Sequence, residues 1–549
     1  MGISLPLDST ASGQADDVLY CANQHEPALF DGRGGRMPLS VTDPGQQHLR
    51  DLWCELYEDI IAHHRDGSRP FPDCGSSHAH HAANCSHCLG TASPKGGGPP
   101  ASPNKEASSD PVCTVEGCPE HDEDSVDRLR IRITILFDGT NNNKTNVKSG
   151  TEKNSDESYS NYYSNIALIE MAGLGEKNAD FHHHKMFYIE GAGTTDNKGD
   201  EFAGYSLGLG ETGVISKVLK GAETVYQFIY KIAKDYEKDI EYVHIDAMGF
   251  SRGAASARNF IHQVVNNEPT SLETWLKKND CKIGEVAAKF IGLFDTVASF
   301  DAIHSNDTKD LHLNSLGKAE KVVQLAAAEE HREKFRLTDI RSAGINGTEI
   351  FLPGVHSDVG GGYPDNVEED NVQLFDIDSF FWNSKAQNSA IERERAWLVN
   401  SGWYMGKGEL LKTNLANEVR GSREKIRNTY QRIPLHIMAE YARSGGVPIS
   451  DKIEFNYSIA NSTLLSESER ELLKKANSAI RIAIEKSKCG SPEYWFGGES
   501  PKNDVWHKPL RNKFLHTSAV YGKNFGAMQP QFSNNDLVKG RRKRIIQDG

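Results

Sequence analysis

One serine lies between two glycines in the stretch DAMGFSRGAA, residues 246–255. Ser251, with Gly249 and Gly253 on either side, gives the pattern G-x-S-x-G, in which a strand turns sharply into a helix and exposes the serine hydroxyl. A serine hydroxyl is too weakly acidic to attack an ester unaided, so a nucleophilic serine needs a base and an acid beside it. The alternative is a turn in which the small residues are needed only for packing.

An acid and a base follow Ser251 in the order that α/β-hydrolases use. Asp295 follows the apolar run of GLFDTVAS, and His356 follows that of GTEIFLPGVHSD. His356 would take the proton of Ser251, while Asp295 would orient the imidazole and stabilise its charged form. Asp295 as a helix N-cap and His356 as a structural histidine are the alternatives, with Asp301 as a less favoured acid and His516 as the best substitute base.

The tetrahedral oxyanion of such a reaction needs preorganised donors. The backbone N–H of Arg252 is one candidate, and the amides of Gly139 and Thr140 in the loop FDGTNNN are the others. Asp138 is expected to organise this loop through bonds to backbone amides, and Asp358 to hold the histidine loop. A serine triad needs no metal and no cofactor, and we predict neither for the active site.

The elements around these residues alternate between strand and helix. Apolar runs that end in polar residues predict five buried strands, and an amphipathic helix at 214–239 separates two of them. This alternation predicts an α/β fold, α/β-hydrolase-like, with a mostly parallel sheet flanked by helices, whose chemistry gathers at the carboxyl ends of the strands. The predicted strands lie within 128–140, 185–193, 241–251, 287–297 and 347–358.

At 549 residues, the chain is expected to hold more than one region. We predict an N-terminal segment (1–125), a catalytic core (126–365) and a helix-rich C-terminal region (366–549). The last region includes an amphipathic stretch at 466–488 and an aromatic loop at 492–498. These either dock on a membrane or cover and complete the core.

The N-terminal segment combines an amphipathic helix (46–64), a cysteine and histidine cluster, and a linker rich in Pro, Gly and Ser (90–112). Four of the cysteines have the chemistry to hold a structural zinc, but their spacing fits no zinc pattern cleanly. Disulfides or unpaired cysteines are the alternatives. The four cysteines are Cys85, Cys88, Cys113 and Cys118.

The net charge of −14 argues against a general nucleic-acid partner, because phosphate binding depends on basic surface. The basic run KGRRKR at 539–544 is interpreted as a solvated end rather than a membrane or partner contact. No apolar run is long enough for a membrane helix, so lipid contact would be peripheral, and the first residues lack the features of a signal peptide.

Four of these motifs together resemble a known family. The stretches FDGTNNN (137–143), GFSRGAA (249–255), GLFDTVAS (292–299) and PGVHSDVGGGY (353–363) resemble those of the DUF2235 group of α/β-hydrolases, and more narrowly the Tle1-like phospholipase effectors of type VI secretion. The resemblance covers residues 128–365 firmly and the remaining C-terminal part loosely. The cysteine and histidine cluster departs from the family pattern. The resemblance therefore leaves open how this protein would be loaded for secretion.

The resemblance implies an antibacterial effector, a phospholipase A that hydrolyses acyl esters of membrane glycerophospholipids with the triad Ser251, Asp295 and His356. It also implies that the protein is made in the bacterial cytoplasm and exported by the type VI system into the target cell, where we expect it to reach the periplasm. Two protein partners are implied as well: a secretion spike protein or adaptor, and an immunity protein. Two alternatives stay open, an inactive hydrolase-fold scaffold and an intracellular esterase of small soluble substrates. The residues do not indicate whether the sn-1 or the sn-2 ester is preferred.

Overall fold

The computed structural model describes residues 30–31 and 35–36 and, from Arg128 onward, the chain apart from gaps at 152, 177, 202–211, 267–268, 299–307, 310, 377–384, 406–408, 414–417, 496–505 and 521–543. Contacts divide the chain into two units, Met1–Asp127 and Arg128–Gly549. In the first unit, β1 (Phe30–Asp31) and β2 (Gly35–Arg36) pair antiparallel. The predicted N-terminal helix, cysteine and histidine cluster, and linker lie outside the described residues.

A six-stranded parallel sheet forms the centre of the second unit, in the order β4-β3-β5-β6-β7-β9. Almost every residue of β3 is buried, as expected for a strand covered on both faces. The predicted α/β class and parallel sheet are therefore confirmed. The strands are β3 (Leu129–Phe137), β4 (His183–Ile189), β5 (Ile240–Phe250), β6 (Ile283–Phe294), β7 (Lys321–Ala327) and β9 (Gly347–Leu352).

Strand β7 lies between β6 and β9 in the sheet, and the sequence did not predict it. Its sequence, KVVQLAA, mixes two valines with glutamine and alanines, which favour helices, so the run gives no clear strand pattern. His356 therefore follows the sixth strand of this sheet rather than the fifth.

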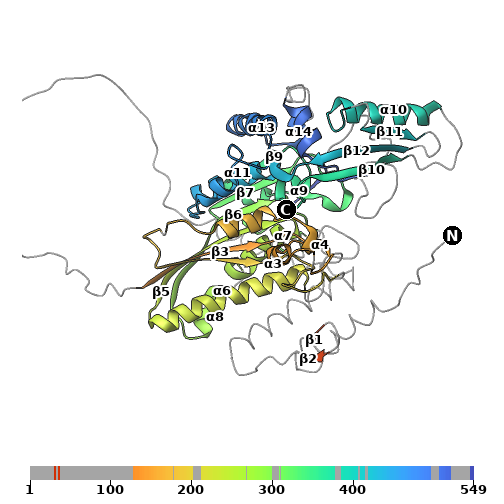
Figure 1. Cartoon of the computed structure of the whole chain (residues 1–549). Helices are drawn as coiled ribbons and strands as arrows, with labels where there is room; N and C mark the ends of the chain where they lie inside the picture. Colours follow the sequence, from red (N-terminus) through yellow and green to blue (C-terminus); the bar gives the residue numbers. More distant parts are fainter. Residues whose placement is uncertain are drawn as a thin grey trace, which may run out of the picture. The chain divides into compact units, whose positions relative to one another are not determined.

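Helices cover both faces of the sheet (Figure 1). On one face, α6 (Val214–Tyr236) contacts α7 (Arg252–Ile261) and α8 (Leu272–Lys278). On the other, α11 (Arg432–Ser444) contacts β6 and β7, and packs beside α5 (Asn165–Ala172). The predicted helix at 214–239 is confirmed by α6, whose buried apolar residues recur at helical spacing. Among the described helices, none is long and apolar enough to cross a membrane.

Beyond residue 365, an unpredicted antiparallel sheet of order β10-β12-β11 adds to the helices. It consists of β10 (Val367–Asp376), β11 (Leu410–Thr413) and β12 (Glu418–Ile426). The helices of this part are α10 (Lys385–Asn400), α11, α12 (Lys452–Asn456), α13 (Glu467–Glu485) and α14 (His507–Phe514). The remaining short α-helices and β-strands described in this unit are α3 (Lys144–Ser149), α4 (Glu157–Ser160), α9 (His356–Gly360), β8 (Leu337–Thr338) and β13 (Ile546–Gln547).

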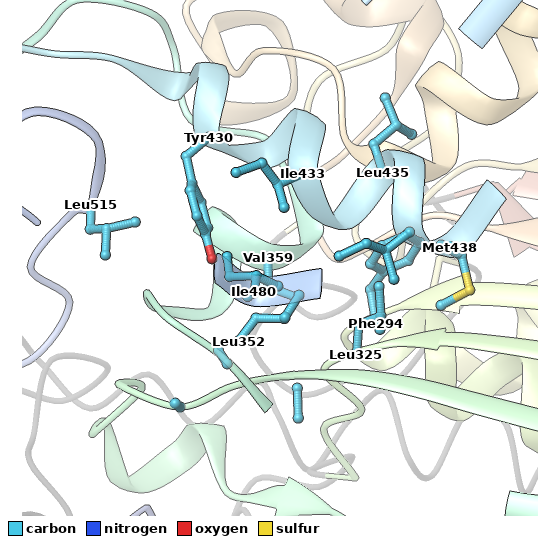
Figure 2. Close-up of a cluster of buried hydrophobic side chains, with 14 of the residues drawn as sticks. Phe294, Leu325, Leu352, Val359, Tyr430, Ile433, Leu435, Met438, Ile480 and Leu515 are labelled. Carbon is cyan, nitrogen blue, oxygen red and sulfur yellow. The ribbon is translucent and has the colours of Figure 1, made fainter. Parts of the chain in front are cut away.

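The hydrophobic core joins the parallel sheet to residues beyond 365. Figure 2 shows Leu325 and Leu352 of the sheet beneath Ile433 and Met438 of α11, with Ile480 of α13 in the same cluster. Burying each such side chain contributes about 2 kcal/mol, so the C-terminal region completes the fold. Residues 466–488 form α13 as predicted.

The aromatic loop at 492–498 is described as far as Trp495, which packs inward. Trp495 is fully buried, and its indole Nε1 donates a hydrogen bond to the Phe351 carbonyl at 2.9 Å. A buried indole with a satisfied N–H belongs to the core. The described part of this loop therefore agrees with the interpretation that it covers the hydrolase core, rather than with membrane docking.

Candidate active site

Ser251 and Asp295 are the first residues beyond two neighbouring strands. The register of β5 and β6 pairs Phe250 with Phe294, and the Ser251 amide donates to the Phe294 carbonyl at 3.0 Å. His356 is the first residue of α9, four residues after the end of β9. The predicted nucleophile, acid and base therefore lie at the carboxyl ends of strands of the same sheet, where α/β proteins place their chemistry.

The G-x-S-x-G sequence forms a strained turn between β5 and α7. Ser251 has φ 60° and ψ −126°, a conformation that a residue with a side chain rarely adopts. A Cβ atom on Gly249 would lie 2.2 Å from the Gly253 carbonyl oxygen, and one on Gly253 would lie 2.2 Å from the Asp138 carbonyl oxygen. Packing explains both glycines. It does not explain a serine in a conformation that glycine would adopt without strain, and this points to a functional hydroxyl.

Gly253→Ala should disrupt the turn. The added methyl group would overlap backbone atoms of Asp138, which cannot move without displacing β3 and the loop that follows it. We expect a loss of about 3 kcal/mol in the free energy of unfolding, measured by denaturant titration, together with a loss of esterase activity. A variant as stable as the wild type would contradict this packing.

His356 and Asp295 form a buried pair. The imidazole Nδ1 lies 2.6 Å from Asp295 Oδ2, and both side chains are almost fully buried. The ring of Phe250 lies against the imidazole with a centroid distance of 4.6 Å, and Phe335 meets it edge-on at 5.0 Å. The residue immediately before Ser251 thus packs on the predicted base, so the turn and the pair form one site.

No described residue accepts a hydrogen bond from the Ser251 hydroxyl in this conformation. Catalytic hydrogen bonds in proteins without substrate are commonly long and tighten when substrate binds. The described geometry therefore places the predicted acid–base pair, His356 and Asp295, against the residue that precedes the predicted nucleophile.

The charge states of the pair suit a general base. Burial lowers the pKa of His356 below its usual value, against the opposing effect of its hydrogen bond to Asp295. Burial alone would raise the pKa of Asp295, but Arg544 and His356 together hold this pKa below its usual value. The carboxylate is therefore ionised and the imidazole neutral at neutral pH, as proton abstraction from serine requires.

A pH prediction follows from the lowered pKa of His356. The neutral base is lost as pH falls through the pKa of His356, so kcat/KM should decrease on the acid side with a midpoint below 6.5, the usual histidine value. A pH–rate profile with a soluble ester measures this midpoint. An acid limb centred well above pH 6.5 would contradict a buried, desolvated base.

The substitute residues are placed elsewhere. His516 pairs with Asp358, with His516 Nδ1 lying 2.7 Å from Asp358 Oδ1, while Asp295 is the partner of His356. The other oxygen of Asp358 accepts the Val355 amide at 3.0 Å, directly before His356. Asp358 thus ties the histidine loop to the segment of His516, in line with its predicted supporting role. Asp301 lies outside the described residues.

The predicted oxyanion loop packs against the turn. Arg252 Nε donates to Thr140 Oγ1 at 2.8 Å, and a Cβ on Gly139 would lie 2.5 Å from the Phe250 ring. The Gly139 amide, however, donates to Asp138 Oδ1 at 2.8 Å, so the prediction that it serves as an oxyanion donor is not supported. The amides of Arg252 and Thr140 are left as candidates: Arg252 directly follows Ser251 as the first residue of α7, and the Thr140 amide donates to no described residue.

Asp138 organises this loop as predicted. Besides the Gly139 amide, its carboxylate accepts the hydroxyls of Ser164 and Tyr188, the latter at 2.6 Å. Burial raises the pKa of Asp138 to about 6, although these hydrogen bonds oppose the rise. A buried carboxyl with three donors thus fixes the loop that packs against the turn of Ser251.

Three charged residues beside the predicted triad were not predicted. Arg544 binds Asp295, Glu330 accepts the His356 amide at 3.3 Å, and Arg332 forms a bidentate pair with Glu330. Glu330 and Arg332 follow β7, and because this strand was not predicted, the segment after it was not expected at the edge of the sheet that carries the site. Arg544 belongs to the basic run interpreted as solvated, and that interpretation is wrong for this residue, whose side chain is fully buried.

A parallel sheet covered by helices, a strained serine turn after a central strand, and a buried histidine–aspartate pair at neighbouring strand ends together define the α/β-hydrolase architecture.

Comparisons with known proteins agree with this class. Residues 262–384 match the model of the family described as type VI secretion system, phospholipase effector Tle1-like, catalytic domain. This match agrees with the resemblance that the motifs predict: residues 262–384 are similar to the catalytic domain of Tle1-like phospholipase effectors. No curated protein matches the sequence.

Among solved structures, the Tle1 effector bound to the VgrG spike of the type 6 secretion system is similar, with a TM-score of 0.51 and 20% identity over 77% of this chain and 94% of that one. It shares the fold. A crystal structure of an uncharacterized protein from Pseudomonas aeruginosa gives a TM-score of 0.33 at 18% identity, covering 64% of this chain and 51% of that one, which carries no further argument.

Proposed function

We propose that this effector is a phospholipase A that uses Ser251 as nucleophile, His356 as general base and Asp295 as the acid that orients the base. The observation that carries the proposal is the buried His356–Asp295 pair packed on the strained turn of Ser251. The similarity of residues 262–384 to Tle1-like phospholipase catalytic domains supports a phospholipid substrate.

The proposed reaction has two half-reactions. His356 takes the Ser251 proton as the serine oxygen attacks the acyl carbonyl, and the amides of Arg252 and Thr140 receive the oxyanion. The imidazolium, stabilised by Asp295, then protonates the leaving glycerol oxygen, and a lysophospholipid departs. Water activated by His356 next releases the fatty acid from Ser251. Each step moves one proton through the same imidazole.

Delivery and partners belong to the same proposal. The similar structure is of an effector bound to a VgrG spike, so we infer that a spike protein or an adaptor loads this chain. The substrate is a membrane glycerophospholipid reached by peripheral contact, the site of action is the periplasm of a neighbouring bacterium, and an immunity protein protects the producing cell. The N-terminal segment is the proposed loading element.

Vesicles of a phosphatidylethanolamine with two different acyl chains test this function. The expected products are one fatty acid and one lysophospholipid, identified by mass spectrometry, and the identity of the fatty acid assigns the sn position. A serine-directed phosphonate should abolish the release. Hydrolysis of soluble esters with vesicles spared would indicate an esterase of small substrates, and no hydrolysis of either would indicate a scaffold.

A further inference from the structure

The segment 544–549 reaches the candidate active site from the far end of the described chain. Arg544 Nη2 donates to Asp295 Oδ2 at 2.9 Å, and Nη1 donates to Asp295 Oδ1. The two residues are 249 positions apart in the sequence, and both side chains are fully buried. The guanidinium thus binds the carboxylate of the proposed triad through both oxygens, a planar geometry that arginine provides and lysine does not.

The remaining guanidinium bonds go to the last residue of β7 and to the 3-10 turn Glu333–Phe335 that follows this strand. Nη1 also donates to the Ala327 carbonyl at 2.6 Å, and Nη2 to the Phe335 carbonyl at 2.9 Å. Asp295 Oδ1 accepts the Ala327 amide at 2.7 Å, and Oδ2 meets His356. Both carboxylate oxygens are fixed by protein donors, so neither can rotate away from the imidazole without breaking several bonds.

Anchoring of the segment does not require Arg544. Strand β13 pairs with β8 in parallel, the Leu337 amide donates to the Ile545 carbonyl at 3.1 Å, and the Asp339 amide donates to the Gln547 carbonyl at 3.0 Å. The Gly549 amide also donates to Asp339 Oδ1 at 3.1 Å. Because backbone bonds hold the segment in place, the buried guanidinium is left to act on Asp295.

We propose that Arg544 is a positioning residue of this active site, whose guanidinium holds the Asp295 carboxylate ionised and aligned with His356. The proposal rests on the proposed triad and extends it to a fourth residue. A buried carboxylate next to a neutral imidazole is costly, and the guanidinium neutralises it. The positive charge of the Arg544 guanidinium also opposes formation of the imidazolium on His356.

Several other charges face His356 from the elements packed around it, and they set the background for this effect. Glu330 beyond β7 raises the pKa of His356, whereas Arg332 in the same segment lowers it. On α9 itself, Asp358 is occupied by His516. Because Glu330 and Arg332 pair with each other, their opposite effects on the pKa of His356 partly cancel. Arg544 acts mainly on the ionisation of the Asp295 carboxylate.

Arg544→Gln tests the proposal, with Arg544→Lys as the conservative variant. The matched control is Arg341→Gln, which removes an exposed arginine that pairs with Asp339 and Asp548 at the same segment. The first readout is an NMR titration of the full chain with labelled histidines, in which the His356 resonance is assigned from its absence in His356→Ala. This readout needs no substrate, so it stays informative even if phospholipid hydrolysis is absent and the proposed function fails.

In Arg544→Gln, the titration midpoint of His356 should move to higher pH, because the opposing positive charge is gone. Arg544→Lys, which keeps the charge, and Arg341→Gln should titrate like the wild type. In the esterase assay, Arg544→Gln should lower kcat by at least about tenfold at neutral pH with KM nearly unchanged.

A folded Arg544→Gln protein with an unchanged His356 titration and unchanged kcat would overturn the proposal. If Arg544→Gln does not fold, Arg544→Lys decides. Lysine cannot form the bidentate pair with Asp295, so kcat of Arg544→Lys should fall by about tenfold while the acid limb of its pH–rate profile stays in place. Full activity in Arg544→Lys would overturn the positioning role.

Discussion

Ser251→Ala is expected to abolish phospholipid hydrolysis, with a loss of kcat on the order of 10⁵-fold. The change removes one oxygen atom from a buried side chain whose hydroxyl bonds to no described residue, so the fold should be unaffected. The strained backbone at φ 60° is held by neighbouring contacts and not by the hydroxyl. Release of fatty acid from vesicles, with circular dichroism and the melting temperature alongside, measures the effect.

Ser256→Ala is the matched control for this variant. Ser256 is another buried serine on α7, and its hydroxyl donates to the Arg252 carbonyl one turn earlier. We expect near-normal activity in this variant. If Ser251→Ala kept even a tenth of wild-type turnover while Ser256→Ala was inactive, Ser251 would not be the nucleophile.

His356→Ala and Asp295→Asn should each reduce kcat by a factor on the order of 10⁴. Without His356 the serine proton has no acceptor, and with asparagine at position 295 the imidazole is held in the wrong tautomer. The structure adds a stability effect for Asp295→Asn. Arg544 would remain buried without its counter-charge, so the free energy of unfolding should fall by about 3–5 kcal/mol.

Assays at a temperature well below the melting point separate this stability effect from the loss of catalysis. His516→Ala serves as the comparison for His356→Ala, because His516 is a second buried histidine paired with an aspartate. A dead His516→Ala variant beside an active His356→Ala variant would transfer the role of base to the pair of His516 and Asp358.

The core of the site could be predicted from sequence because its parts are local. Each motif combines a buried strand with the polar residue that ends it, so Ser251, Asp295 and His356 could be placed at strand ends without knowing the order of the sheet. The glycines of the turn were predictable for the same reason. The contact between Gly253 and the Asp138 backbone shows the steric cause.

What could not be predicted depends on long-range packing. Strand β7 has a mixed composition that favours neither helix nor strand, and it becomes a strand because β6 and β9 flank it. The commitment of the Gly139 amide to Asp138 is set by loop geometry. Arg544 lies in a basic run whose composition is typical of a solvated tail, and only the pairing of β13 with β8 brings it to Asp295. No local pattern carries that information.

Active-site labelling tests the central claim most directly. The full chain is treated with a fluorophosphonate, digested, and analysed by mass spectrometry to locate the modified residue. A single adduct on Ser251 is expected, formed in parallel with loss of phospholipid hydrolysis, absent in Ser251→Ala and greatly slowed in His356→Ala, which lacks the base that activates the serine. An adduct on another residue, or hydrolysis that continues while Ser251 is fully labelled, would contradict the account.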